Sequence, residues 1–222
     1  SLLETSKYFE DPLEGKRVAL IGYGNVGSSI AEFLHDYGCR VIAITDIYGG
    51  IYNRNGISIP ELNTYVKRTK SVKGFHKYDS ITNEELIESD CDILLPCAME
   101  GMITRENAEK IKAHWICEGA NGPTTSEANE ILCKRGTFII PDILANAGGV
   151  GVSYLEWVQD LQKYFFSEAE VKDRCWNMIQ KAFWEVIRIQ EKYKTDMRQA
   201  AYILAVQRVA DSVRMLGKIG RN

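Results

Sequence analysis

Glycines at a fixed spacing mark the part of the chain best suited to bind a ligand through its backbone. An apolar run at residues 18–21 leads into them, a helix-like stretch at 28–37 follows, and a second apolar run at 41–44 ends at Asp46. In a strand–turn–helix–strand unit such glycines allow the tight turn, the close approach of a pyrophosphate and close helix–strand packing. The pattern predicts a dinucleotide site, with a plain glycine-rich turn as the alternative. The glycines have G-x-G-x-x-G spacing: Gly22, Gly24 and Gly27.

Apolar runs and helical patterns alternate through residues 16–140. This alternation predicts an α/β fold, a Rossmann-like, doubly wound, mostly parallel sheet followed by C-terminal helices. In such sheets the ligand lies beyond the carboxyl ends of the strands, at the switch point of the strand order. Four segments with polar or turn residues follow predicted strands and should converge there: 22–27, Asp46, 96–99 and 119–121.

The individual elements follow from periodicity and from cap and turn residues. Thr82 and Glu85 have the spacing of a capping box at the start of a short helix. Residues 47–59 are glycine-rich and are predicted to form a hairpin or loop. Strands are expected at 18–21, 41–44, 92–95, 115–117 and 138–140, with a weaker one within 72–79. Helices are expected at 2–10, 28–37, 60–70, 104–113 and 125–135. The helix at 28–37 is expected to pack on the sheet through Val26, Ile30, Ala31, Phe33 and Leu34.

From residue 145 onward the pattern changes to long helices. A glycine-rich break at 148–151 precedes them, and helices are expected at 153–165, 168–192 and 196–216. These helices contain three tryptophans, Trp157, Trp176 and Trp184. We interpret them as residues of the helix core or of subunit contacts rather than as a surface on which a ligand ring stacks. The expected division of the chain is a lead-in helix and turn at 1–15, a dinucleotide-binding domain at 16–152 and a helical segment at 153–222.

Composition narrows the class of protein. The 222 residues are 45% hydrophobic and 26% charged with a net charge of −3, which is ordinary for a globular protein and argues against nucleic acid as a partner. No apolar run is long enough to span a membrane, and the sequence shows no signal peptide, so a cytoplasmic location is expected. His35, His76 and His114 neighbour no nucleophile motif and receive no catalytic role. The cysteines form no C-x-x-C pair and are expected to be reduced thiols that hold no metal: Cys39, Cys91, Cys97, Cys117, Cys133 and Cys175.

A long segment near the domain boundary resembles a known signature. Residues 141–159, Pro-Asp-Ile-Leu-Ala-Asn-Ala-Gly-Gly-Val-Gly-Val-Ser-Tyr-Leu-Glu-Trp-Val-Gln, look like the signature of glutamate dehydrogenases, within the Glu/Leu/Phe/Val dehydrogenase family. Gly-Tyr-Gly-Asn-Val-Gly, Pro-Cys-Ala, Glu-Gly-Ala-Asn-Gly-Pro-Thr and Asp-Met-Arg-Gln-Ala-Ala-Tyr occur in the family's order. The resemblance covers the whole chain, but only the C-terminal, cofactor-binding half of the enzyme.

The resemblance implies roles for individual residues. The turn residues Gly22, Gly24, Asn25, Val26 and Gly27 would contact the dinucleotide, and Asp46 with Ile47 would receive the adenosine ribose. Cys97 and Ala98 resemble the segment that lines the adenosine side. Asn121 resembles the asparagine near the nicotinamide ribose, and Asn146 the one that reaches the carboxamide or the substrate. Ser153 resembles the serine that hydrogen-bonds the side-chain carboxylate of glutamate, although the preceding glycine break also permits a helix N-cap there.

The choice between NAD and NADP depends on the charges near the ribose. Asp46 would repel a 2′-phosphate, and neither Ile47 nor Tyr48 offers a positive charge, so NAD is favoured. Arg54 lies close enough in sequence that its loop could place a positive charge near the ribose. NADP therefore stays open as the second cofactor.

The resemblance also implies what this chain lacks. The family's lysines and aspartate for catalysis belong to an N-terminal domain whose motifs are absent here, so no catalytic residue is expected in this chain and it is expected to be inactive alone. The whole enzyme would be a homohexamer that oxidatively deaminates L-glutamate to 2-oxoglutarate and ammonium. Residues 153–222 would pack on the dinucleotide-binding domain and on the missing substrate domain. The alternatives are a nucleotide-binding module without catalysis and a leucine- or phenylalanine-type dehydrogenase domain.

Overall fold

The chain forms two compact units in a computed structural model that describes residues 1–75 and 77–217. The first, which we call the sheet unit, comprises Leu2–Asn146. The second, the helical unit, begins at Ala147. The division between the units lies earlier in the chain than the predicted boundary between residues 152 and 153. His76 lies outside the described residues.

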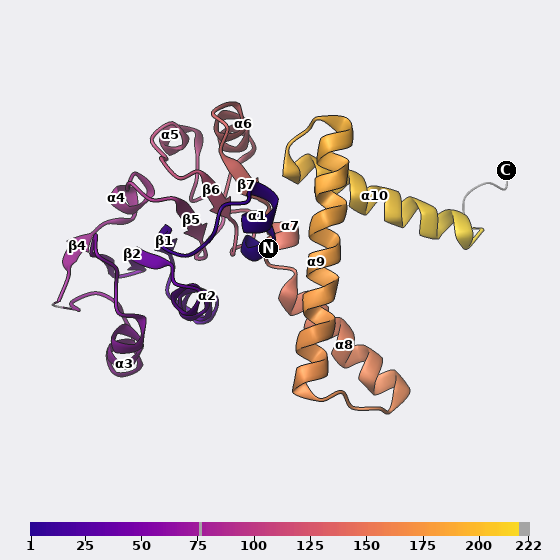
Figure 1. The fold of residues 1–222 in the computed structure, drawn as a ribbon, viewed down its shortest axis with the longest axis horizontal. Coiled ribbons are helices and arrows are strands. Elements are labelled where there is room, and N and C mark those ends of the chain that lie inside the picture. Colours follow the sequence, from indigo (N-terminus) through magenta and orange to yellow (C-terminus); the bar gives the residue numbers. More distant parts are fainter. Residues whose placement is uncertain (76, 218–222) are drawn as a thin grey trace. The chain divides into compact units, whose positions relative to one another are not determined.

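The sheet unit is built on a seven-stranded sheet in the order β4-β3-β2-β1-β5-β6-β7 (Figure 1). Five strands are parallel, whereas β3 and β4 pair antiparallel at one edge. The predicted Rossmann-like, mostly parallel sheet is confirmed. The chain passes from β1 to β2 on one side and later places β5 on the other side of β1, so the switch point lies between β1 and β5. The strands are β1 (Arg17–Ile21), β2 (Arg40–Asp46), β3 (Gly49–Tyr52), β4 (Asp79–Ile81), β5 (Ile93–Pro96), β6 (Trp115–Cys117) and β7 (Phe138–Ile140).

One prediction for the edge of the sheet is confirmed and one is displaced. The glycine-rich segment 47–59 forms the predicted hairpin, because β3 pairs antiparallel with β2. The strand expected within 72–79 is instead β4. Gly50 pairs with Thr45 of β2, and a Cβ at Gly50 would lie only 2.4 Å from the Thr45 methyl group. Glycine at position 50 of this hairpin is therefore needed for close strand packing, which is one of the established uses of glycine in a strand.

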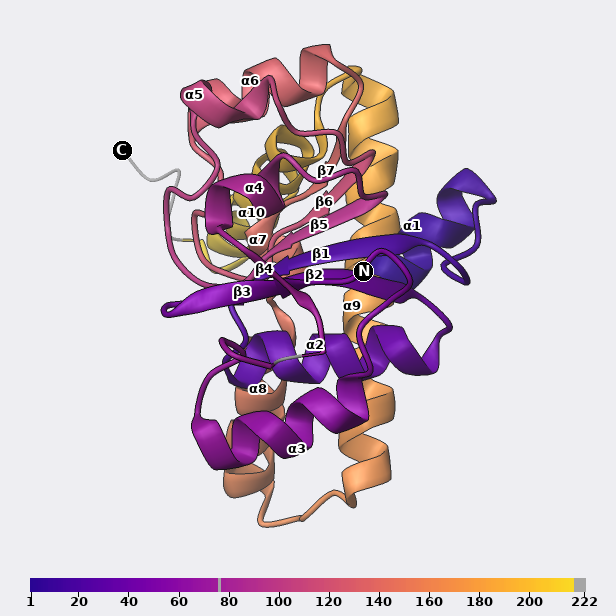
Figure 2. The same ribbon diagram turned by 90° about the vertical axis from the view of Figure 1, so that its left-hand side faces the viewer.

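Helices cover both faces of the sheet. Figure 2 shows α2 and α3 on one face and α4, α5 and α6 on the other. The Thr82–Glu85 capping box is confirmed at the start of α4. Helix α5 is shorter than predicted, because the Arg135 guanidinium binds the carbonyl oxygens of Ala108 and Ile111 and the chain then leads directly into β6. The helices of this unit are α1 (Leu2–Phe9), α2 (Asn25–Asp36), α3 (Ile59–Thr69), α4 (Asn83–Ile87), α5 (Arg105–Ala108), α6 (Ser126–Lys134) and α7 (Asp142–Ala145).

The inner face of α2 was predicted only in part. Gly27, Ala31 and Leu34 are its buried residues, whereas Val26 is 51% and Phe33 is 36% exposed. The buried stripe follows i, i+4, i+7 spacing from Gly27. Because the helix meets the sheet at its glycine, the larger side chains on either side of that stripe face outward.

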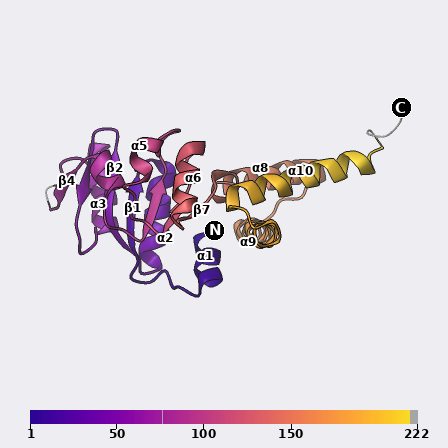
Figure 3. The same cartoon turned by 90° about the horizontal axis from the view of Figure 1, so that it is seen from above.

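The helical unit consists of α8 (Gly148–Gln162), α9 (Glu168–Tyr193) and α10 (Met197–Met215), with α9 packed against the other two (Figure 3). The predictions for α9 and α10 are confirmed. The predicted break at 148–151 is wrong, because these residues form the first turn of α8. Trp157 is 58% exposed and Trp176 is also exposed. In the described part of the chain, no helix has both the length and the apolar character required to cross a bilayer.

Candidate functional site

The first glycine of the turn is held by two constraints. Gly22 has φ +97°, a region that side chains rarely adopt, and its N–H donates to the Thr45 carbonyl oxygen at 2.9 Å. A Cβ at Gly22 would lie 2.8 Å from the Ala98 Cβ. The turn after β1 therefore lies directly against the segment that follows β5, at the switch point.

The remaining glycines prepare the start of α2. A Cβ at Gly27 would lie 1.9 Å from the Gly22 carbonyl oxygen, so only glycine lets the helix begin this close to the turn. Gly24 is the N-cap and provides no side-chain hydrogen bond, and apart from its chain neighbours no residue has a heavy atom within 4 Å of the position of its missing Cβ. The first N–H groups of a helix lack intrahelical partners and attract anions. The turn therefore fits a pyrophosphate, and the exposed residues Asn25 and Val26 flank it.

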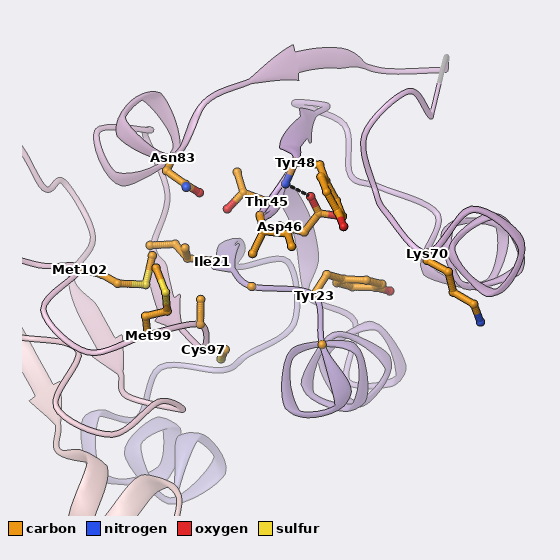
Figure 4. Close-up of a pocket in the computed structure, with 14 residues that line it drawn as sticks. Ile21, Tyr23, Thr45, Asp46, Tyr48, Lys70, Asn83, Cys97, Met99 and Met102 are labelled. Carbon is orange, nitrogen blue, oxygen red and sulfur yellow. Dashed lines mark hydrogen bonds between the residues drawn. The ribbon is translucent and has the colours of Figure 1, made fainter.

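A pocket of about 580 Å³ lies beyond the carboxyl ends of β1, β2 and β5 (Figure 4). Its volume lies within the range typical of small-molecule and cofactor sites. Several residues singled out from the sequence line it: Gly22, Gly24, Asp46, Ile47, Cys97 and Ala98. Tyr23 and Met99 also line it, within the segments 22–27 and 96–99 that were expected to converge here. Sequence reasoning assigned no site role to the remaining polar, charged and methionine residues of the lining: Thr45, Tyr48, Lys70, Asn83 and Met102. Asn25, Val26, Gly27, Asn121 and Asn146 are not among its lining residues.

Asp46 is held rigidly at the end of β2. Its Oδ1 accepts a hydrogen bond from the Tyr48 N–H at 2.8 Å, which Figure 4 shows. Its Oδ2 accepts from Ser71 Oγ and from the Val72 N–H, both at 2.7 Å. A carboxylate has about four acceptor positions, so these three bonds leave capacity for a ligand hydroxyl. The Asp46 side chain is therefore held in one orientation before a ligand binds. Its hydrogen bonds from Ser71 and Val72 also hold the loop after α3 beside the pocket.

Tyr23 supports the glycine turn from the side of α3. Its hydroxyl donates to Asn63 Oδ1 at 2.6 Å, and Asn63 Nδ2 donates to Glu32 Oε1 at 2.6 Å. Burial, with the nearby Glu32 charge, raises the pKa of Tyr23 well above its ordinary value. The phenol therefore stays a neutral donor, and this network joins the turn to α2 and α3.

The basic residue that borders the pocket is not the one suspected from the sequence, and Figure 4 shows its amino group directed away from Asp46. Lys70 is the only basic side chain among the described residues that line the pocket. It is the C-cap of α3 and adopts a left-handed conformation with φ +64°. Arg54 lies in the turn after β3 and is not part of this lining. No local pattern could have identified Lys70, because its place depends on how α3 ends.

Cys97 is an uncharged residue in the lining of the pocket. Burial, with nearby Cys117, raises the pKa of the Cys97 thiol to about 12, so it adds no negative charge to the pocket at neutral pH. A Cβ at Gly119 would lie 2.6 Å from Cys97 Sγ, which explains the glycine after β6. The structure records all six cysteines as free. Among residues 1–75 and 77–217, no group of three or more His, Cys, Asp or Glu side chains is placed to hold a metal ion.

Two asparagines that the sequence singled out lie side by side. Asn146 Nδ2 donates to Asn121 Oδ1 at 2.7 Å and to the Ala120 carbonyl oxygen at 3.5 Å. Asn121 follows β6 and Asn146 follows the short helix α7, so the ends of neighbouring parallel strands bring them together. We call these two residues the asparagine pair.

Ser153 lies in the helical unit. It is exposed within α8, which begins five residues earlier at Gly148. The alternative interpretation of Ser153 as a helix N-cap is therefore wrong. Its role toward a substrate stays a prediction.

Known proteins resemble this chain along nearly its whole length. The family described as Glutamate/Leucine/Phenylalanine/Valine dehydrogenase matches residues 2–217. The glutamate dehydrogenase of Thermotoga maritima is 51% identical over 201 residues, covering 90% of this chain and 48% of that protein. The NAD-specific glutamate dehydrogenase of Staphylococcus aureus is 43% identical over 205 residues, covering 92% of this chain and 49% of that protein.

A solved structure supports the same relationship. The hetero-hexameric glutamate dehydrogenase from Thermus thermophilus, in a Leu-bound form, matches with a TM-score of 0.90 at 30% sequence identity. The match covers 100% of this chain and 51% of that one. The chain spans about half the length of the curated relatives it matches.

Proposed function

The chain belongs to the Glu/Leu/Phe/Val dehydrogenase family, and we propose that it is the dinucleotide-binding half of a glutamate dehydrogenase. The observation that carries the proposal is the glycine turn at the switch point, where Gly22, Gly24 and Gly27 leave the start of α2 open to an anion. The similar proteins named glutamate dehydrogenase support the substrate.

In this proposal the chain binds and orients the cofactor. The N-terminus of α2 receives the pyrophosphate, and the oriented Asp46 carboxylate accepts a ribose hydroxyl. The asparagine pair lies toward the nicotinamide half. The bound dinucleotide would accept a hydride from Cα of the amino acid, which is the chemistry that nicotinamide supplies.

The substrate role of this half is to hold one end of the amino acid. Ser153 would donate a hydrogen bond to the side-chain carboxylate of L-glutamate, and Asn146 would contact the substrate or the carboxamide. A hydroxyl donor suits a carboxylate, whereas leucine and phenylalanine present only apolar side chains. The catalytic lysine and aspartate would come from the other half of the enzyme, so this chain alone would release no ammonium.

We propose NAD as the preferred cofactor. Asp46 is held at the ribose end of the pocket by three hydrogen bonds, and its charge would repel a 2′-phosphate. The relative from Staphylococcus aureus carries the name NAD-specific. Lys70 at the pocket keeps NADP as a weaker ligand.

The proposal extends to the whole protein. We propose that the full-length enzyme acts in the cytoplasm as a homohexamer, and the Thermus thermophilus relative described as hetero-hexameric supports an assembly of that size. Light scattering of the full-length protein and localisation of a tagged copy test these two statements.

Calorimetric titration of this chain with NAD and NADP tests the cofactor. Saturable NAD binding, tighter than NADP binding, is the expected result. Absence of binding to either would overturn the proposed function. An assay of the full-length protein with L-glutamate, L-leucine and L-phenylalanine tests the substrate, and faster turnover of leucine or phenylalanine would reject glutamate. Glutamate turnover by this chain alone would contradict its assignment as a binding half.

A further inference from the structure

We infer that Glu118 and Asp142 are positioning residues that hold the asparagine pair in place for the nicotinamide half of the dinucleotide. We call these two acids the carboxylate brace. The inference rests on the proposed function, because it assigns a task within the same cofactor site. It concerns two acids that the sequence did not single out for any role.

Glu118 is a fully buried carboxylate at the end of β6. Its Oε2 accepts a hydrogen bond from the Asp142 N–H at 2.8 Å, and its own N–H donates to the Ile140 carbonyl oxygen at 3.1 Å. Burying a carboxylate is costly unless hydrogen bonds compensate. Glu118 therefore links β6 firmly to the first residue of α7, at the edge of the sheet where Rossmann-like folds bind their ligands.

Asp142 carries this link to both asparagines. Its Oδ2 accepts from the Gly122 N–H at 2.8 Å, which fixes the residue directly after Asn121. Its Oδ1 accepts from the Ile143 N–H at 2.8 Å, and its carbonyl oxygen accepts from the Asn146 N–H at 3.0 Å. The side chain of Asp142 thus fixes the backbone next to Asn121, and its carbonyl group fixes the backbone of Asn146.

The fixed pair presents a defined set of hydrogen-bonding groups. Because Asn146 Nδ2 donates to Asn121 Oδ1, the groups left over are Asn121 Nδ2 and Asn146 Oδ1. Neither has a partner among the residues that the structure describes. A free amide NH₂ beside a free amide carbonyl complements a primary carboxamide, which has one acceptor oxygen and two donor hydrogens. The carboxamide of nicotinamide is such a group, and the adenosine half of the cofactor has none.

A comparison of two ligands separates positioning from general support of the fold. NAD contains the nicotinamide, whereas ADP-ribose contains only the adenosine, pyrophosphate and ribose parts. Loss of the brace should weaken NAD alone, because the glycine turn and Asp46 would still bind ADP-ribose. A purely structural role would weaken both ligands together.

The test is calorimetric titration of the 222-residue chain and its variants with NAD and with ADP-ribose. In Asp142→Asn one acceptor oxygen becomes an NH₂ that faces a backbone N–H, at almost unchanged volume. We expect NAD to bind about tenfold more weakly, the loss of roughly one hydrogen bond, while ADP-ribose changes less than about twofold. Asp36→Asn, at the exposed far end of α2, is the matched control and should change neither affinity.

Glu118 provides a second pair of variants. Glu118→Gln keeps an oxygen that can accept from the Asp142 N–H and should retain NAD binding to within about threefold. Glu118→Leu removes that acceptor and should reproduce the selective loss seen in Asp142→Asn. ADP-ribose binding reports in every case that the site is folded.

Three outcomes would overturn the inference. They are parallel loss of both ligands in the variants, unchanged NAD binding in Asp142→Asn and Glu118→Leu, and equal affinity of the parent chain for NAD and ADP-ribose. Failure of the parent chain to bind either ligand would instead reject the proposed function, so the two failures are distinguishable.

Discussion

The carbonyl oxygen of Gly22 lies where the Cβ of any larger residue at position 27 would have to be. The distance between that oxygen and the ideal Cβ position is 1.9 Å, well inside van der Waals contact. The first turn of α2 is therefore locked to the glycine turn by direct backbone contact, and the position of the pyrophosphate-binding N–H groups follows from this contact.

Gly27→Ala should separate α2 from the turn. Overpacking of this kind costs about 1–3 kcal/mol, so the midpoint of urea unfolding should fall and NAD affinity should drop at least about tenfold. Gly24→Ala is the control for stability alone, because apart from its chain neighbours no residue has a heavy atom within 4 Å of its Cβ position. It should keep the unfolding midpoint yet weaken NAD, since the methyl group would occupy the path of the pyrophosphate. A Gly27→Ala variant as stable as the parent would contradict the close contact.

Asp46→Asn should change the cofactor preference. The substitution removes the charge that repels a 2′-phosphate, and it leaves one acceptor oxygen where two now serve Tyr48, Ser71 and Val72. The ratio of NADP to NAD dissociation constants should therefore fall about tenfold in calorimetric titration. If the ratio stays unchanged, Asp46 does not determine the preference.

Lys70→Ala should raise the ratio of NADP to NAD dissociation constants, whereas Asp46→Asn should lower it. Lys70 is the one basic residue among the described residues that line the pocket, so its loss should weaken NADP by about threefold to tenfold and leave NAD unaffected. Because charges at a pocket mouth are screened by salt, the effect should shrink between 50 and 500 mM salt, concentrations that bracket a Debye length of about 10 Å. Arg54→Ala serves as the comparison, and a larger effect there would restore the role that the sequence suggested for Arg54.

Tyr23→Phe should loosen the turn without removing the ring. It breaks the hydrogen bond to Asn63 and leaves that partly buried acceptor without its donor, at a cost of about 1 kcal/mol. NAD should bind several-fold more weakly as the turn loses its support from α3. Tyr37→Phe, at an exposed ring at the end of α2, should be neutral in both urea unfolding and NAD titration. Equal effects from the two variants would show that the Tyr23 network is unimportant.

Asp92→Asn should alter the pH dependence of stability. Asp92 accepts hydrogen bonds from the Arg17 N–H and guanidinium, and although burial opposes ionisation, these bonds lower its pKa below the ordinary value. A lowered carboxyl pKa adds stability above the unfolded value of about 3.9, and that stability is lost as pH falls through the folded value.

The free energy of unfolding of Asp92→Asn should therefore be about 1–2 kcal/mol lower than that of the parent chain at pH 7, after allowance for partial solvent exposure. This difference between variant and parent should narrow below about pH 4. Urea unfolding at several pH values measures it. A difference that is constant from pH 7 to pH 3 would exclude the ionised carboxylate as its source.

Features that depend only on neighbouring residues could be predicted from the amino-acid sequence. The G-x-G-x-x-G turn, the alternation of strands and helices and the Thr82–Glu85 capping box are local, because backbone conformation and side-chain periodicity act over a few residues. The α/β class, the switch point and the place of Asp46 at the end of β2 followed from them. The resemblance of residues 141–159 to a known signature added the family.

The individual contacts between residues distant along the chain became evident only in the folded structure. Lys70 reaches the pocket because α3 ends beside it, and Asp142 holds the residue after Asn121 because β6 and β7 are neighbours. The glycine-rich composition of 47–59 left a hairpin and a loop open, and only the pairing of Gly50 with Thr45 showed why a strand there excludes a side chain. Contacts of this kind depend on how the sheet assembles, and no local preference of the chain encodes them.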